Sequence, residues 1–391
     1  MKWDFDDAPP REGTDCIKYD FRKETFGVSD LIPLWVADMD FKTPDFIINA
    51  LSARLSHEIL GYSYRPEKYF TSIINWTKER HNWNLERDWI CFSPGIVPAI
   101  NLCTLAFTNE GDSIVVQPPV YFPFFSAVEA NGRKLLYNQL RETDGNWEMD
   151  FENLRSLAGQ KPKMIIISNP HNPVGRAWSA GELEELVDIC TENNILILSD
   201  EIHCDLVMPD YKHTPVSTIS DMAPGITITC IAPSKTFNLA GLYTSSVIIP
   251  DRVRRKAFND LTGKLHITGG NIFGTEASIA AYTHGKEWLE QLLNYINSNY
   301  NYVFEYCRNL IPEIIPSRLE ATYLLWLDCR KFNMKGSELQ SFFITQAGVG
   351  MNEGSTFGPG GEGFMRMNLA CTRKTLEKAM TQIESAVNSM R

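Results

Sequence analysis

The sequence predicts an α/β protein with a mostly parallel sheet and a second, smaller α+β unit. Over the first two thirds of the chain, short apolar β-branched runs alternate with helical patterns, which is typical of a parallel sheet covered by helices on both faces. In the last third, long helical patterns surround isolated strand-like runs. A chain of 391 residues is also too long for one compact core, so two domains are expected.

Six apolar runs bounded by turn residues are predicted to be buried strands. They are Trp89–Ser93, Ser113–Gln117, Met164–Ser168, Ile195–Asp200, Ile226–Ala232 and Ser245–Ile249. Between the third and fourth runs, Ser179–Asn193 is predicted to be a helix, because its apolar residues recur at helical spacing. Ser179 and Glu182 begin this helix as an S-x-x-E capping box.

The C-terminal third is predicted to alternate helices with single strands. The helices are Lys286–Asn309, Gly336–Ala347 and Thr372–Met390, and the strands are Tyr323–Asp328 and Phe364–Ala370. We therefore expect a large domain over residues 46–285 and a small domain formed by residues 1–45 and 286–391. The N-terminal segment contains few helical signals and is expected to wrap against the C-terminal unit.

Composition argues against several classes of protein. With 37 basic and 48 acidic residues, the net charge of −11 is unsuited to holding nucleic acid by bulk charge. The acidic, aromatic start lacks the pattern of a signal peptide, and no run approaches the ~18–20 apolar residues that span a membrane. We therefore predict a cytoplasmic protein without nucleic-acid or membrane partners. Nine scattered cysteines without a C-x-x-C pair suggest neither a disulfide framework nor a metal site.

Three polar residues stand where predicted strands end. Lys235, in Ala232–Phe237, follows one strand, and partial desolvation there would lower its pKa and make it a better nucleophile toward an aldehyde. Asp200 ends another strand and could pair with a protonated ring nitrogen. Asn172 lies in an Asn-Pro-His-Asn-Pro-Val-Gly turn that would hold it rigidly. Taken singly, these residues are more simply interpreted as a surface lysine, a loop or N-cap carboxylate and an ordinary turn.

Three further elements extend this candidate site. The Ser93–Ala99 turn joins a strand to a predicted helix, whose free N–H groups would bind phosphate. Tyr121 offers an aromatic face for a flat ring, although a core or surface tyrosine fits the local sequence as well. Arg366 interrupts an apolar strand, where a guanidinium is either salt-bridged or binds a carboxylate in bidentate fashion. The Gly358–Gly363 run does not open a helix after a strand, so no dinucleotide site is predicted there.

In this order along the chain, the elements resemble those of fold-type I pyridoxal-5′-phosphate (PLP) enzymes, the aspartate aminotransferase superfamily. Within it, the chain is most similar to the MalY/PatB class of C–S β-lyases, and the resemblance covers nearly the whole chain. The segments that carry the closer resemblance are Trp35–Phe41, Gln117–Tyr121, Asn169–Gly175, Ser199–His203 and Ala232–Leu242.

The resemblance implies a role for each site residue. Lys235 would bind PLP covalently and move the substrate Cα proton, and Arg366 would bind the substrate α-carboxylate, with Ala37 as a further substrate contact. The residues implied to hold the cofactor are Gly95, Ile96, Val97, Tyr121, Asn172, Asp200, His203, Ser234 and Lys235, with Tyr62 reaching the phosphate of the neighbouring subunit in a homodimer.

Two departures from the wider superfamily stand out. His203 occupies a position where many relatives have tyrosine, so its role is open. Tyr243 stands where many relatives carry a phosphate-binding arginine, which the lyase class also lacks. The expected reaction is therefore α,β-elimination of L-cystathionine or a related cysteine S-conjugate to thiol, pyruvate and ammonia. An aminotransferase with the same residues and a regulatory protein that retains PLP remain as alternatives.

Overall fold

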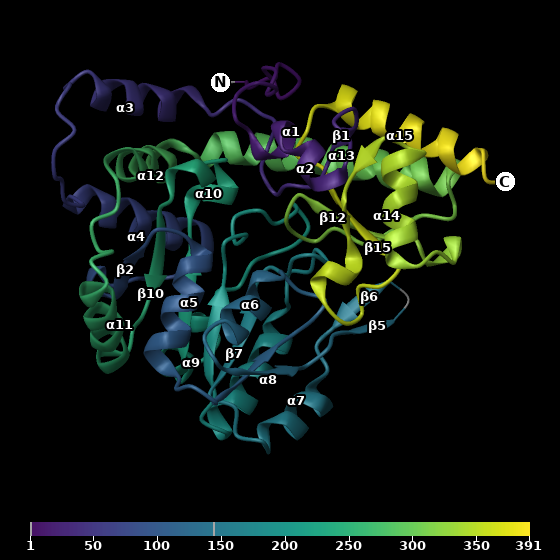
Figure 1. Ribbon diagram of the computed structural model, residues 1–391. Coiled ribbons are helices and arrows are strands. Elements are labelled where there is room, and N and C mark those ends of the chain that lie inside the picture. Colours follow the sequence, from purple (N-terminus) through teal and green to yellow (C-terminus); the bar gives the residue numbers. More distant parts are fainter. Residues whose placement is uncertain (1, 144) are drawn as a thin grey trace.

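The computed structural model describes residues 2–143 and 145–391, and its centre is a seven-stranded sheet (Figure 1). Strand β10 (Ser245–Ile248) runs antiparallel to both of its neighbours, and the other six strands all run in one direction. Met1 and Asp144 belong to the predicted domains but lie outside the described residues. In spatial order the strands are β2 (Ile90–Ser93), β10 (Ser245–Ile248), β9 (Thr227–Ile231), β8 (Leu196–Asp200), β7 (Met164–Ser168), β3 (Ser113–Val116) and β4 (Lys134–Tyr137).

Helices cover both faces of this sheet, as the apolar strands require. On one face Ile165 and Ile167 of β7 pack with residues of α7 (Phe151–Ala158) and α8 (Ala180–Glu192). On the other face Met164 and Ile166 pack with α5 (Ile96–Phe107), α6 (Pro123–Glu129) and α11 (Arg252–Lys264). Alternate side chains of each strand thus enter two separate cores, and no face of the strand is left for water.

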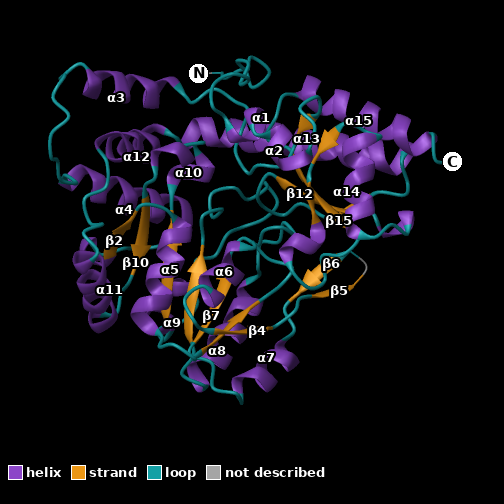
Figure 2. Ribbon diagram, in the orientation of Figure 1, coloured by secondary structure: helices purple, strands orange, loops and turns teal. Residues whose placement is uncertain are grey.

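The C-terminal unit contains a four-stranded antiparallel sheet in the order β11 (Ile315–Pro316), β12 (Leu324–Asp328), β15 (Phe364–Asn368), β14 (Asn352–Glu353). Its helices are α13 (Lys286–Leu310), α14 (Gly336–Thr345) and α15 (Arg373–Asn388). Figure 2 shows helices and strands of this unit beside the larger sheet. The predicted strands and helices of this region are confirmed, and no bound differs from its predicted position by more than two residues.

The N-terminal segment lies along this unit. Its β1 (Ile32–Pro33) pairs in parallel with β13 (Val349–Gly350), and Phe5 packs against Trp288 of α13. This segment also forms two short helices, α1 (Ile17–Asp20) and α2 (Arg22–Phe26). The wrapping of the segment follows the expectation, whereas the domain boundaries at 45/46 and 285/286 stay a prediction.

The remaining elements connect these layers. They are α3 (Asp45–Leu55), α4 (Glu67–His81), α9 (Ala223–Ile226), α10 (Pro233–Thr236), α12 (Ile272–His284), β5 (Arg141–Thr143) and β6 (Asn146–Glu148). All nine cysteines are free, and eight are buried as small apolar residues. Among the described residues, no helix has both the length and the apolar character needed to cross a bilayer.

Candidate active site

The carboxyl ends of three neighbouring strands place the main polar residues at one edge of the large sheet. Asp200 is the last residue of β8, Asn172 follows β7 by four residues, and Lys235 follows β9 by four. Since these strands are parallel and adjacent, their carboxyl ends share that edge. Residues predicted separately from the sequence are thus gathered at one edge.

Lys235 lies on the short helix α10, directly after the buried strand β9. Its Nζ donates a hydrogen bond of 2.6 Å to the backbone oxygen of Ala37, the predicted substrate contact. Burial, with a smaller contribution from Arg366, lowers the pKa of Lys235 to about 8, although Asp38 and Asp200 act to raise it. A substantial fraction of this amine is therefore neutral near physiological pH, as a base or nucleophile requires.

Asp200 is buried at the end of β8 and has no cation in contact with it among the described residues. One backbone donor, the N–H of Ile202, reaches its Oδ1 at 3.1 Å. Burial raises the pKa of Asp200 to about 7, and Glu201 adds to the rise, although Ile202 and Lys235 oppose it. A buried carboxyl with so few partners can accept a hydrogen bond from a cationic N–H group of a ligand, and such a partner would favour its charged form.

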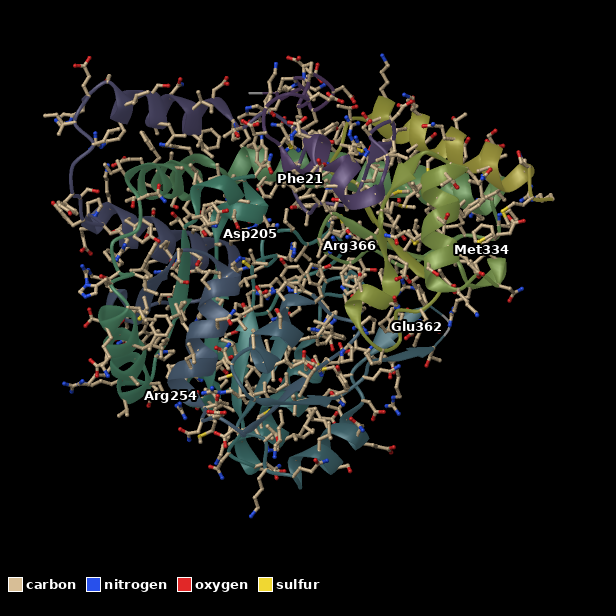
Figure 3. The ribbon with its side chains drawn as sticks, viewed as in Figure 1. Phe21, Asp205, Arg254, Met334, Glu362 and Arg366 are labelled. Atoms are coloured by element: carbon tan, nitrogen blue, oxygen red, sulfur yellow. The ribbon has the colours of Figure 1, made fainter. Side chains whose placement is uncertain are left out.

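Arg366, on β15, projects into the interior between the two sheets (Figure 3). Its Nη1 donates to Asn172 Oδ1 at 3.0 Å, while Nη2 donates to the Trp35 oxygen at 3.0 Å and to Asn352 Oδ1 at 2.8 Å. Its buried Nε has no partner, and no carboxylate is paired with it among the described residues. Burial lowers the pKa of Arg366 to about 10. A buried guanidinium without an anion is costly unless a ligand supplies one.

Tyr121 and His203 lie close enough to the same charges to interact with them electrostatically. Burial raises the pKa of Tyr121, with Arg366 lowering it and Asp200 raising it. Burial lowers the pKa of His203 to about 3, and Lys235 and Arg366 lower it too. His203 is therefore neutral, and its Nδ1 has no hydrogen-bond partner. This nitrogen is therefore available to a ligand. The predicted contact of His203 with the cofactor stays a prediction.

The predicted phosphate turn lies at the carboxyl end of β2, where Gly95 is the N-cap of α5. The strand registers place this end beside the end of β9, because Ser93 pairs with Ser245 and Ser246 pairs with Ile231. The first intrahelical bond runs from Ala99 N to the Gly95 oxygen, which leaves the N–H groups of Ile96 and Val97 outside the helical ladder. Ser234, beside Lys235, is partly exposed.

Tyr62 does not join these residues within one chain. Its side chain is fully exposed, at 113%, in the connection between α3 and α4. Ile59, Leu60 and Tyr64 of the same connection are also exposed. The predicted role of Tyr62 therefore depends on a second copy of the chain.

Two contributors to the site were missed in the sequence. Tyr323 donates from its hydroxyl to the Ala37 oxygen at 2.9 Å, and Asn368 Nδ2 donates to the Val36 and Asp38 oxygens, each at 2.6 Å. A signal for Asn368 was present, because it lies two residues after Arg366 on β15 and hence on the same face of that strand. Tyr323 sits in an apolar run and looks like a core residue.

A cluster of His81, Cys204 and Asp205 behind the site has ligand atoms close enough to hold a metal ion. Protein donors already occupy the carboxylate, however. Asp205 Oδ1 accepts from Trp76 Nε1 and lies 2.9 Å from His81 Nε2, and Oδ2 accepts from Thr236 Oγ1 at 2.9 Å. These hydrogen bonds account for the cluster without an ion.

Fold and site together define an enzyme of the fold-type I PLP-dependent class, and the chain belongs to the aminotransferase class I and II family, whose model matches residues 29–383. The chain is 42% identical to cystathionine beta-lyase PatB of Bacillus subtilis (strain 168) over 385 residues, which are 98% of this chain and 100% of that protein. The expected fold class and family are therefore confirmed.

Two solved structures have the same fold over the full chain. A PLP-bound putative aminotransferase from Clostridium difficile 630 has a TM-score of 0.97 and 41% identity, with 99% of this chain and 100% of that chain covered. A PLP-bound C–S lyase from Staphylococcus hominis has a TM-score of 0.92 and 32% identity, with 99% and 98% covered.

Proposed function

We propose that this protein is a PLP-dependent C–S β-lyase that eliminates thiol from L-cystathionine or a related cysteine S-conjugate, leaving pyruvate and ammonia. The observation that carries the proposal is that Lys235, an amine partly neutral near physiological pH, lies near a buried guanidinium, Arg366, that has no anionic partner among the described residues. An α-amino acid brings the carboxylate that Arg366 lacks. Relatives named as a cystathionine beta-lyase and a C–S lyase favour elimination over transamination.

The residues present fit PLP. Asp200 lacks a cationic partner within the described part of the chain and is placed to bind a protonated ring nitrogen, which would restore its charge. The N–H groups that open α5 suit a phosphate, and Tyr121 offers a face to the ring. When bound, PLP supplies an electron sink that makes the substrate Cα–H bond acidic.

The protein's own groups then have separate tasks. Arg366 orients the substrate by its carboxylate, while Asn172 holds one edge of the guanidinium in place. Lys235 would hold the cofactor covalently between turnovers, and its Nζ, once displaced by the substrate amine, would take the proton from Cα as a neutral base. With Cα deprotonated, the bond from Cβ to sulfur breaks and the thiolate leaves.

A homodimer forms part of the proposal, with Tyr62 completing the phosphate site of the neighbouring subunit. The support is that Tyr62 is fully exposed within an apolar connection that the described residues of its own chain leave uncovered. A cytoplasmic location and an amino-acid substrate complete the proposal, and both stay predictions.

The test is a panel of cysteine S-conjugates and amino acids, with thiol and pyruvate measured together. Equimolar release of thiol and pyruvate from L-cystathionine is expected. Turnover that depends on a keto acid and releases no thiol would instead assign the chain as an aminotransferase, the function named for the Clostridium difficile structure. PLP binding without turnover of any amino acid would indicate a regulatory protein.

A further inference from the structure

An ion cluster attaches the N-terminal segment to residues 35–40, which we call the site-facing segment. Arg11 binds both oxygens of Asp38, with Nη1–Oδ1 at 3.0 Å and Nη2–Oδ2 at 2.7 Å. The same Nη1 also binds Asp40 Oδ1 at 2.7 Å. Lys18 is fully buried and donates from Nζ to Asp40 Oδ1 at 3.0 Å. Two cations and two carboxylates thus form a charge-balanced cluster, and such bidentate pairs are geometrically specific.

The other side of the site-facing segment supplies acceptors to the active site. The Ala37 oxygen accepts from Lys235 Nζ at 2.6 Å and from the Tyr323 hydroxyl at 2.9 Å. The Trp35 oxygen accepts from Arg366. One short stretch of backbone therefore positions both the amine and the guanidinium, and the ion cluster holds that stretch from behind.

We propose that Arg11 is a positioning residue for the reaction: it fixes the site-facing segment that holds Lys235, and it offsets the charge of Asp38, the carboxylate adjacent to Ala37. This inference rests on the proposed function, because it takes Lys235 as the base. Arg11 lies 27 residues before Asp38 in the chain and touches neither Lys235 nor Arg366 in the described structure. It acts only through the segment that it binds.

The charges around Lys235 give the direction of the effect. Asp38 and Asp200 raise the pKa of Lys235, and Arg366 lowers it. His203 and Tyr323 are neutral neighbours, because burial lowers the pKa of the first and raises that of the second. On the far side, Asp38 faces Arg11 and, at 3.8 Å, Lys18.

Removal of Arg11 leaves the cluster with one excess negative charge on the site-facing segment. That charge stabilises a proton on the Lys235 nitrogen, both in the free amine and in the C=N bond that Lys235 would form with PLP. In the PLP-bound protein this nitrogen is therefore expected to hold its proton to higher pH, and the visible absorbance reports it. A carboxylate freed of its bidentate partner is also less fixed in position.

The experiment titrates the visible absorbance of the PLP-bound protein against pH for Arg11→Gln, Arg11→Lys and the wild type. The titration midpoint of Arg11→Gln is expected to rise by roughly one pH unit, the effect of one charge at a partly buried site. Arg11→Lys keeps the charge and should lie between the two. Lys42→Gln is the matched control, since it removes the exposed Lys42–Asp7 ion pair of the same region.

The double variant Arg11→Gln/Asp38→Asn separates charge from general loosening. It removes one cation and one carboxylate, so its midpoint should return to the wild-type value or below. An unchanged midpoint in Arg11→Gln, an equal shift in Lys42→Gln, or a double variant that stays as high as Arg11→Gln would each overturn the inference. Failure of the proposed function looks different: the protein would not bind PLP, or would release no thiol.

Discussion

Arg366 and Asn172 are joined by a hydrogen bond of 3.0 Å from Nη1 to Oδ1, although 194 residues separate them in the chain. The bond links β15 of the C-terminal unit to the turn after β7 of the large sheet. The Nε of the same guanidinium is buried and has no hydrogen-bond partner. The two units therefore meet at a guanidinium that is oriented by the protein but has no counter-ion among the described residues.

Substitution of Arg366 tests this arrangement. Arg366→Ala is expected to lower kcat/KM by an amount equivalent to about 2–5 kcal/mol of lost transition-state stabilisation, because one partner of a buried charge pair with the substrate is lost. Arg366→Lys keeps the positive charge but not the planar set of N–H donors that binds a carboxylate in bidentate fashion. Its kcat/KM should therefore lie between those of Arg366→Ala and the wild type. Steady-state kinetics with L-cystathionine measure both. An unchanged kcat/KM in Arg366→Ala would contradict the assigned role.

The polar residues at the sheet edge were predictable because parallel strands bring their carboxyl ends together. Apolar runs identify β7, β8 and β9, and whatever follows them must share one edge, so the amino-acid sequence alone groups Asn172, Asp200 and Lys235. The edge strand β4 and the hairpin of β5 and β6 were missed. They are short and carry several half-exposed or exposed residues, so no continuous apolar run marks them.

Contacts to backbone oxygens were not predictable in the same way. Lys235 and Tyr323 share the oxygen of Ala37, and a carbonyl is the same group in every residue. Only the path of the site-facing segment decides which carbonyl points into the site. That path depends on long-range packing of the N-terminal segment, so the sequence carries no local pattern for it.

The stability of the cofactor-free protein should report the burial of Lys235. Its pKa is about 8 in the folded chain against 10.5 as the ordinary value. Between these values the unfolded chain binds more protons, so wild-type stability gains from rising pH across this window. Lys235→Met removes this partly exposed amine. It should be more stable than the wild type below about pH 8, by on the order of 2 kcal/mol after allowance for solvent screening.

The measurement is urea unfolding of both cofactor-free proteins at about pH 7 and about pH 10. The advantage of Lys235→Met should shrink at the higher pH as the wild-type amine becomes neutral. Lys42→Met, at an exposed site, should show no such pH dependence of its difference from the wild type. If Lys235→Met gains the same stability over the wild type at both pH values, then packing and not ionisation causes the gain.

Asp200→Asn tests the proposed partner of the ring nitrogen. The amide is nearly the same shape but carries no charge, so the ring would lose the group that favours its protonated form. We expect kcat to fall by roughly 10²–10³-fold, as when one preorganised electrostatic group is removed from a site. PLP should still bind through Lys235, which the absorbance of the purified protein checks. Full activity in Asp200→Asn would refute the pairing.

The proposed role of Tyr62 predicts complementation between two defective chains. Lys235→Ala lacks the catalytic amine, and Tyr62→Ala lacks the exposed tyrosine. If Tyr62 serves the neighbouring subunit, a mixed dimer contains one site with both wild-type residues and one site with neither. Each variant alone should be inactive or weak at limiting PLP, because Tyr62→Ala holds the phosphate less tightly.

Mixing and re-association of the two variants should restore activity to roughly a quarter of the wild-type value, because half the dimers are mixed and each has one intact site. Activity and PLP content after unfolding and refolding of the mixture provide the measurement. Mixing Lys235→Ala with Asp200→Ala is the matched control, since both residues act within one chain and no mixed site is intact. If the first mixture gives only the sum of the activities of its parents, Tyr62 does not act across the subunit interface.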